Sequence, residues 1–148
     1  MGIPESWIVN RLIADGQMTG FVSGNVYPVY VKQDTSFPFV TYKRTGTKRD
    51  NTTRGSDGVP QATIQVVAWA LDYEEGKRIA DRIRKVVKLT DRGEEFQYQT
   101  DTGTDKVFIR KCFLTDESDI DEFPPIGREL PFYGVQLTFD ITYTELLA

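Results

Sequence analysis

The sequence contains no histidine and a single cysteine, Cys112. Histidine is the commonest general acid or base near neutral pH and the commonest metal ligand, so its absence argues against many catalytic and metal-dependent mechanisms. A lone cysteine cannot form an intrachain disulfide, which fits a protein made in a reducing cytosol. Because a cysteine–histidine nucleophile is excluded, we expect Cys112 to be a small residue of the core.

Nucleotide-binding and nucleophile motifs are also missing from the sequence. The chain has neither the glycine-rich loop of P-loop NTPases nor the glycine fingerprint of dinucleotide-binding folds. Its serines do not stand in the strand–turn–helix context of a nucleophile elbow. We therefore predict no catalytic residue, no cofactor and no metal site, and a chain that is not an enzyme.

Long apolar runs and an excess of positive charge are absent as well. No run approaches the roughly 20 apolar residues that cross a bilayer, and residues 1–5 lack the basic start of a signal peptide, so we expect an unprocessed cytoplasmic product. The formal net charge of −4 argues against a general duplex-DNA binder. The length of 148 residues, 39% of them hydrophobic and 27% charged, fits one globular domain over residues 1–148.

The N-terminal segment has the pattern of one short helix. In residues 4–15 the apolar residues recur at helical spacing and give one apolar stripe. Pro4 suits the first turn, because the N–H that proline lacks would have no partner there. Gly16 is well placed to end the helix, and we expect residues 20–25 to form a loop.

Two strands and a long polar segment follow. Residues 26–31 predict a short strand at the edge of a sheet, because Pro28 cannot donate a hydrogen bond to a neighbouring strand. Residues 37–44 mix aromatic and β-branched residues and predict a second strand. Residues 45–60 are polar and rich in glycine, threonine and charge, which predicts a long hairpin loop.

Residues 62–89 give the clearest prediction: a strand, a turn and a helix. Residues 62–69 are mostly apolar on both faces, which is typical of a central strand. Asp72 has the chemistry of an N-cap, with Glu75 three residues later as in a capping box. The helix then has an apolar stripe on one face and charged residues on the other. The small Gly76 on the stripe would let the helix lie close to a sheet.

Three more strands are predicted after this helix. Residues 95–100 and 106–114 form an antiparallel pair across a turn, and residues 115–131 form a long acidic loop that contains prolines. Residues 132–144 alternate between apolar and polar, as in a strand with one buried face. The whole pattern predicts an α+β fold: a mainly antiparallel sheet with two helices packed on one face and long polar hairpin loops.

Four segments succeed one another in an order that matches a known family. Gly-Asn-Val-Tyr-Pro at 24–28 follows the first helix, and Phe-Pro-Phe-Val-Thr-Tyr stands at 37–42. The strand at 62–70 runs into the helix that Asp72 begins, and Phe-Asp-Ile-Thr-Tyr stands at 139–143. In this order the sequence resembles, over most of its length, the small tail-completion (tail-terminator or head-to-tail joining) proteins of long-tailed bacteriophages.

The resemblance implies a structural virion protein without a reaction or a cofactor. Such proteins form a ring, usually of six subunits, that caps the head-proximal end of the tail tube and ends tube polymerisation. The implied partners are further copies of the chain, the tail tube protein and the head-side connector or stopper. DNA would only pass through the lumen, no membrane would be involved, and synthesis would take place in the cytoplasm of the bacterial host. A ring needs a heterologous interface, which an edge strand such as residues 26–31 could supply.

A basic segment is the first candidate for a subunit or partner interface. Between residues 43 and 54 it holds one acid, Asp50, and five cations, which are Lys43, Arg44, Lys48, Arg49 and Arg54. A loop of this length and charge could dock on an acidic surface of the tube, the connector or a neighbouring subunit. The alternative is a solvated hairpin tip. Contact with DNA is disfavoured, because no aromatic residues interleave with the cations.

An acidic segment is the second candidate. Between residues 116 and 122 it has no base and five acids, which are Asp116, Glu117, Asp119, Asp121 and Glu122. A calcium loop of the EF-hand type is disfavoured, because that loop lies between two helices and needs a central glycine, whereas two prolines follow a strand here. We expect an acidic surface loop that repels DNA or pairs with the basic segment of a neighbouring subunit.

Three other functions remain compatible with the sequence alone. A head-closure or another minor tail protein would have a similar size and pattern. A small enzyme could build a carboxylate site from Asp116, Asp119 and Asp121, and a nucleic-acid-binding module could use the basic segment.

Overall fold

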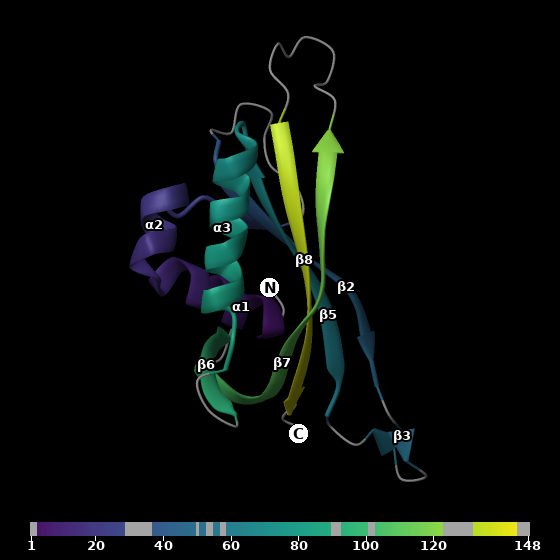
Figure 1. Cartoon of the computed structure of the whole chain (residues 1–148). Coiled ribbons are helices and arrows are strands. Elements are labelled where there is room, and N and C mark those ends of the chain that lie inside the picture. Colours follow the sequence, from purple (N-terminus) through teal and green to yellow (C-terminus); the bar gives the residue numbers. More distant parts are fainter. Residues whose placement is uncertain are drawn as a thin grey trace.

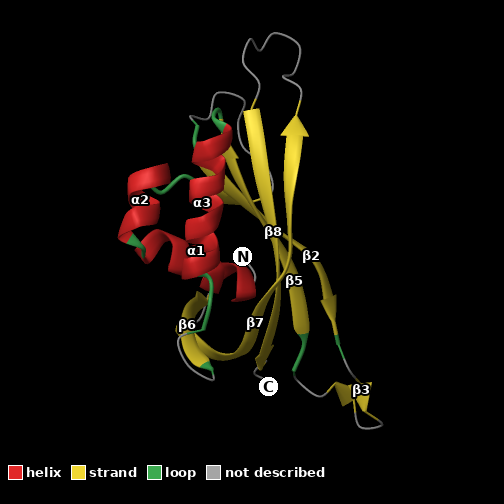
Figure 2. Ribbon diagram, in the orientation of Figure 1, coloured by secondary structure: helices red, strands yellow, loops and turns green. Residues whose placement is uncertain are grey.

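Six strands form one curled sheet, and three helices gather on one of its sides, among the residues that the computed structural model describes (Figures 1 and 2). These residues are 3–28, 37–49, 51–52, 55–56, 59–89, 93–100, 103–122 and 132–144. The strand order is β1-β2-β5-β8-β7-β6, with a parallel β1–β2 pair and antiparallel pairs elsewhere. The predicted α+β class with a mainly antiparallel sheet is confirmed, and a third helix is added to the two that were predicted.

The added helix lies where a loop was predicted. Helix α1 (Ile3–Ala14) ends as expected, but the chain then enters α2 (Gly16–Val22), so the prediction that residues 20–25 are all loop is wrong. Asp15 is the N-cap of α2, and its Oδ2 accepts a hydrogen bond of 3.0 Å from the backbone N–H of Met18. Met18 and Val22 stand one turn apart and are both buried, which gives this short helix its stabilising face.

The first half of the sheet follows the predicted order. Strand β1 (Val26–Pro28) lies at one edge, and β5 (Gln61–Ala70) lies between β2 (Phe39–Lys48) and β8, which confirms the central strand and the first half of the predicted edge strand. Residues 29–31 of that predicted strand lie outside the described residues. Strand β2 continues to Lys48, beyond its predicted end at residue 44. Within the predicted hairpin loop a separate two-stranded sheet forms from β3 (Asn51–Thr52) and β4 (Gly55–Ser56), which project beyond the main sheet (Figure 1).

Helix α3 (Tyr73–Val86) packs on the centre of the sheet, against β5 and β8. The N-cap predicted at Asp72 is confirmed, because its Oδ1 accepts from the backbone N–H of Glu74 at 3.4 Å. Gly76, Ile79 and Ile83 are buried on the face toward the sheet. None of the described helices is long and apolar enough to span a membrane.

The last three strands are β6 (Glu94–Thr100), β7 (Gly103–Glu122) and β8 (Phe132–Thr144). Strand β7 is far longer than predicted, so the prediction of a loop is wrong for residues 115–122, while residues 123–131 lie outside the described part of the chain. The physical reason is pairing: β8 continues opposite β7 as far as the pair Glu122–Phe132. Irregularities between Ile109 and Lys111 and between Leu114 and Asp116 adjust the register on the way.

The two faces of the sheet differ in what covers them. Along β8, alternate residues from Val135 to Tyr143 are buried beneath the helices, as the sequence alternation predicted. On the opposite side, which we call the open face, no described helix or strand lies over the sheet (Figure 2). Register and alternation place on the open face Phe39, Thr41 and Lys43 of β2; Thr63, Gln65, Val67 and Trp69 of β5; Gly134, Gln136, Thr138 and Asp140 of β8; and Phe113, Asp116, Ser118 and Ile120 of β7.

Candidate interaction surface

The basic residues predicted as an interface divide between the two faces of β2. Lys43 and Lys48 are exposed, and their cross-strand partners Gln65 and Gln61 place both on the open face. Arg49 is exposed and follows directly after the strand. Arg54 lies outside the described residues. The open face of β2 therefore carries two exposed lysines of the predicted basic segment.

Arg44 points to the helix side of the sheet, where it is held by the fold. Its Nε donates to the carboxylate of Glu5 on α1, and its Nη1 donates to Thr47 Oγ1 at 3.0 Å. Burial opposes the charge of this guanidinium, but the hydrogen bond and negative charge of Glu5 outweigh that cost and raise the pKa of Arg44. Arg44 thus ties β2 to α1 inside the chain.

The acidic residues also divide between the faces, because β7 is a strand and not a loop. Asp116 pairs with Thr138 and is exposed on the open face, whereas Glu117 and Asp119 turn toward α3. Asp121 and Glu122 form the end of β7. The structure therefore separates Asp116 from Asp119, so these two carboxylates do not form the shared site that a small enzyme would need.

Helix α3 supplies cations to the two acids that face it. Lys77 Nζ forms an ion pair with Asp119, which also accepts from the Tyr73 hydroxyl at 3.0 Å. Arg84 Nη1 lies 3.5 Å from a carboxylate oxygen of Glu117. The hydrogen bond from Lys77 lowers the pKa of Asp119 and outweighs its desolvation. A catalytic general acid needs the opposite shift, so this geometry stabilises an ionised surface pair.

Lys43 and Asp116 of one chain lie too far apart to pair with each other. Lys43 pairs with Gln65, Gln65 pairs with Thr138, and Thr138 pairs with Asp116, so the two charges stand in one row across the open face. Three interstrand spacings of roughly 4.8 Å separate them, which amounts to about 14 Å. This separation excludes an ion pair between Lys43 and Asp116 of one chain.

Aromatic side chains on the open face include Trp69, which the sequence offered as a core or interface anchor, and Phe113, which was not singled out from the sequence. Phe113 is 61% exposed on β7. Trp69 Nε1 donates to Thr41 Oγ1 at 3.0 Å, and its indole lies against Gly134 on the neighbouring strand. Strand alternation alone could not predict the outward position of Phe113, because the two register shifts in β7 flank it.

Cys112 lies away from these charges, half-buried against the core as predicted. Its Sγ is 3.9 Å from the carbonyl oxygen of Val87, and burial raises the pKa of the thiol to about 12. The thiolate is therefore scarce at neutral pH, and the thiol lacks nucleophilic character. Across the described ranges, no group of three or more histidine, cysteine, aspartate or glutamate residues is placed to hold a metal ion.

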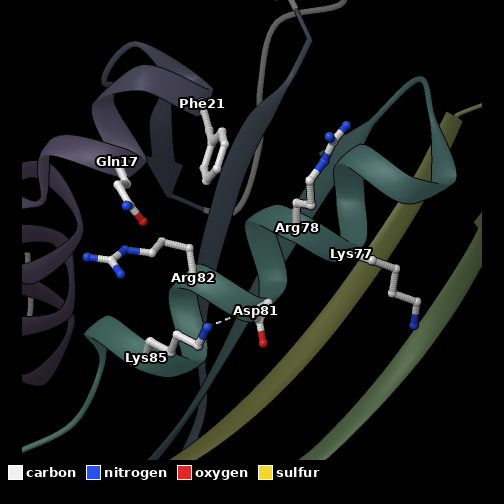
Figure 3. A pocket seen from close by; sticks show the side chains of 7 residues that line it. All are labelled: Gln17, Phe21, Lys77, Arg78, Asp81, Arg82 and Lys85. Atoms are coloured by element: carbon white, nitrogen blue, oxygen red, sulfur yellow. Dashed lines mark ion pairs between the residues drawn. The ribbon is translucent and has the colours of Figure 1, made fainter.

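A groove runs between α2 and α3 on the helix side (Figure 3). Its lining residues are Gln17, Phe21, Lys77, Arg78, Asp81, Arg82 and Lys85. Arg82 donates to both oxygens of Asp15, at 2.8 and 2.5 Å, and Lys85 lies 3.0 Å from Asp81. Lys77, Arg82 and Lys85 are thus paired with carboxylates of the same chain, and the pair of Arg82 with Asp15 ties α3 to the N-cap of α2.

A comparison with family models gives a match over most of the chain. The family model described as "Tail completion protein gp17" matches residues 7–110, more than half of the chain. Among solved structures, the chain is similar to a chain described as "Virion of native gene transfer agent (GTA) particle", with a TM-score of 0.61 and 13% sequence identity over 93% of this chain and 91% of that chain. At that identity the likeness shows the fold alone. A comparison with curated proteins finds no match.

Proposed function

The chain belongs to the tail completion protein gp17 family, and from this membership we propose that it forms a ring that caps the head-proximal end of a phage tail tube. It is a structural protein of the phage tail. The family match is the observation that supports the proposal. It spans residues 7–110, which include most of α1, all of α2 and α3, and the strands from β1 to β6. In this proposal the whole chain, residues 1–148, acts as one domain.

The action of the ring is geometric. One axial side fits the last ring of tube subunits, and the other side offers no surface on which another tube subunit can add. The second side then meets the head-side connector, and DNA passes through the lumen. Six subunits is the proposed count. No step in this function needs a catalytic group or a cofactor.

The placement of exposed charges of opposite sign toward the two sides of the sheet supports self-association in a closed ring. A ring requires two different surfaces on each subunit, one that fits the other in the neighbouring copy. The exposed Lys43 and Lys48 lie on β2 toward one edge of the sheet, and the exposed Asp116 lies on β7 toward the other. We include both charged segments, residues 43–54 and 116–122, in the candidate interface, with Arg44, Glu117 and Asp119 in supporting positions because they are paired within the chain.

Tube capping tests the proposal. Purified tail tube protein of the same phage or prophage is allowed to polymerise with increasing amounts of this protein, and tube lengths are measured by negative-stain electron microscopy. We expect shorter tubes that each bear a ring at one end, while an unrelated protein of similar size and charge leaves the lengths unchanged. Unchanged tube lengths together with binding to the isolated connector would instead indicate a head-closure protein.

A further inference from the structure

Half of the open face is accessible across four strands, and we call this half the platform. Register places its side chains in rows that run from β2 through β5 and β8 to β7. The rows are Lys43, Gln65, Thr138 and Asp116; Gly46, Thr63, Asp140 and Phe113; and Lys48, Gln61, Thr142 and Lys111, beyond which Phe108 lies opposite Thr144. All of these residues are exposed or half-buried, whereas Phe39, Thr41 and Val67 in the other half are buried. The platform is therefore open to a ligand.

The three lysines of the platform and the neighbouring Arg110 are free cations. Lys43, Lys48 and Lys111 are exposed and form no ion pair with any described residue, and exposed Arg110 stands in the register irregularity directly before Lys111. On the helix side most cations pair with a carboxylate of the same chain, namely Arg11, Arg44, Lys77, Arg82, Arg84 and Lys85. Within the described ranges the positive charge left for an external ligand thus lies mainly on the platform, because α3 adds only Arg78 and Lys88 to it.

Two acids share the platform but do not cancel its charge. Asp140 accepts a hydrogen bond of 2.8 Å from a threonine hydroxyl of β5, and Asp116 is exposed at the end of the first row. Glu95, across from the last row, is paired with Lys106. Farther along β7 the acids that follow turn toward α3, and Asp121 lies about 17 Å beyond Asp116, at roughly 3.4 Å per residue. Four free cations therefore stand against two carboxylates, in a chain whose net charge is −4.

Two phenylalanines of β7 flank these cations. Phe113 is 61% exposed and Phe108 is 45% exposed, and Lys111 lies between them on the same face. An exposed aromatic ring is a surface on which a nucleobase stacks, and sheets that bind single-stranded RNA present such rings on one face. The sequence concealed this arrangement, because no aromatic residues interleave with the cations of residues 43–54 and the two rings come from a strand far along the chain.

We propose that the platform binds single-stranded nucleic acid along β7, with bases stacked on Phe113 and Phe108 and phosphates bound by Arg110 and Lys111. The lysines of β2 widen the positive field from the far side of the sheet, and threonine and glutamine side chains between them offer hydrogen bonds to sugars and base edges. The ligand contacts β7, so subunit contacts of β2 in a ring leave the site free.

The two rings favour a single strand over other anionic ligands. A duplex keeps its bases stacked on one another, so it engages the cations alone, and an acidic protein segment has no base to place on the rings. Single-stranded DNA and RNA share the chemistry of this site. The binding is separate from the proposed tube capping and does not depend on it.

Fluorescence anisotropy with the whole chain tests the ligand class. The probes are a labelled thymidine oligonucleotide, the uridine oligonucleotide of equal length, a DNA duplex of that length and a polyglutamate peptide. We expect a single strand to bind more tightly than the duplex and the peptide, and the tighter of the two strands identifies DNA or RNA as the ligand. The logarithm of the affinity should fall with the logarithm of the salt concentration with a slope of about −0.7 per phosphate contact. Binding of the duplex or the peptide as tight as that of both strands, or no binding of either strand at low salt, would overturn the proposal.

Substitutions at exposed positions test where the strand lies. Phe113→Ala and Phe108→Ala should each weaken binding about tenfold, while Phe113→Trp, which keeps a stacking ring, should preserve it. Lys111→Gln should reduce the steepness of the salt dependence by about 0.7. The matched controls are Ile13→Ala, an exposed apolar residue of α1, and Lys88→Gln, an exposed cation at the end of α3, and neither should change the affinity.

The contrary outcomes are equally specific. Unchanged affinity of Phe113→Ala would overturn base stacking, and an equal loss for Lys88→Gln and Lys111→Gln would overturn the platform as the binding surface. Circular dichroism of each variant shows that its fold is intact. A wild-type protein that caps tail tubes but binds neither single strand would refute this inference alone, whereas one that binds a strand but never caps tubes would refute the proposed function alone.

Discussion

Gly134 of β8 lies where the indole of Trp69 from β5 leaves no room for a side chain. A Cβ at this position would stand 2.8 Å from Cζ3 and 3.0 Å from Cε3 of the indole. The ring cannot swing away without loss, because Trp69 Nε1 donates to Thr41 Oγ1 at 3.0 Å. We expect Gly134→Ala to lower the free energy of unfolding by about 1–3 kcal/mol, the usual cost of overpacking. In a chain of this size that corresponds to a fall in Tm of about 3 °C per kcal/mol.

Urea unfolding followed by circular dichroism measures this cost. Gly46→Ala is the matched control, because Gly46 lies on β2 with no heavy atom within 4 Å of its added Cβ, and we expect a change below about 0.5 kcal/mol. Trp69→Leu should relieve the crowding, so Gly134→Ala should cost less in that background than in the wild type. Equal stability of the Gly134→Ala and Gly46→Ala variants would refute the close packing on the open face.

Three further predictions concern the core and the ionisable groups. Hydrogen bonds from Arg82 lower the pKa of Asp15 to about 2, below its usual 3.8, so the stability this pair contributes is complete above about pH 4 and is lost as the pH falls toward 2. Between pH 6 and pH 3 the free energy of unfolding in urea should therefore fall more for the wild type than for Asp15→Asn, and equal falls would count against the pair. Because burial raises the pKa of Cys112 to about 12, an aromatic disulfide reagent at pH 8 should label this thiol only after unfolding in urea, and rapid labelling of the native protein would contradict its burial. Ile83→Ala, at a fully buried position of α3, should lower the free energy of unfolding by about 2–5 kcal/mol in the same assay, whereas Lys88→Ala should lower it by less than about 0.5 kcal/mol. A similar change for both variants would contradict the packing of α3 on the sheet.

The elements that were predicted well are those whose signal is local. In α3 the cap at Asp72 and the apolar stripe that includes Ile79 and Ile83 lie within one continuous stretch of sequence. In β8 the clean alternation from Val135 to Tyr143 needs no knowledge of the partners. The central position of β5 was predicted from its mostly apolar composition, although its open face carries Thr63 and Gln65.

The elements that were missed depend on contacts distant in sequence. Residues 115–122 of β7 hold many acids, which strands usually avoid, yet β8 pairs with them and α3 offers Lys77 and Arg84 to two of their carboxylates. Helix α2 is short and glycine-rich, so its own propensity is poor and its burial against the other helices stabilises it. A local signal did exist there, since Asp15 precedes Met18 and Val22 at capping and helical spacing.

The candidate interface was only partly visible in the sequence. The composition predicted which segments carry positive and negative charge. It did not predict that Arg44 pairs with Glu5, or that Asp116 and Asp119 turn to opposite faces. Which face each acid takes depends on the register shift between Leu114 and Asp116, and a shift of one residue reverses every later side chain.

The position of the protein on an assembled tail tests its role most directly. A tagged copy can be incorporated into tails, labelled with gold and located by negative-stain electron microscopy. We predict label in a single ring at the end of the tube that meets the head, with none along the tube. Label along the whole tube, label at the distal tip, or tails without any label would contradict a tail-completion ring.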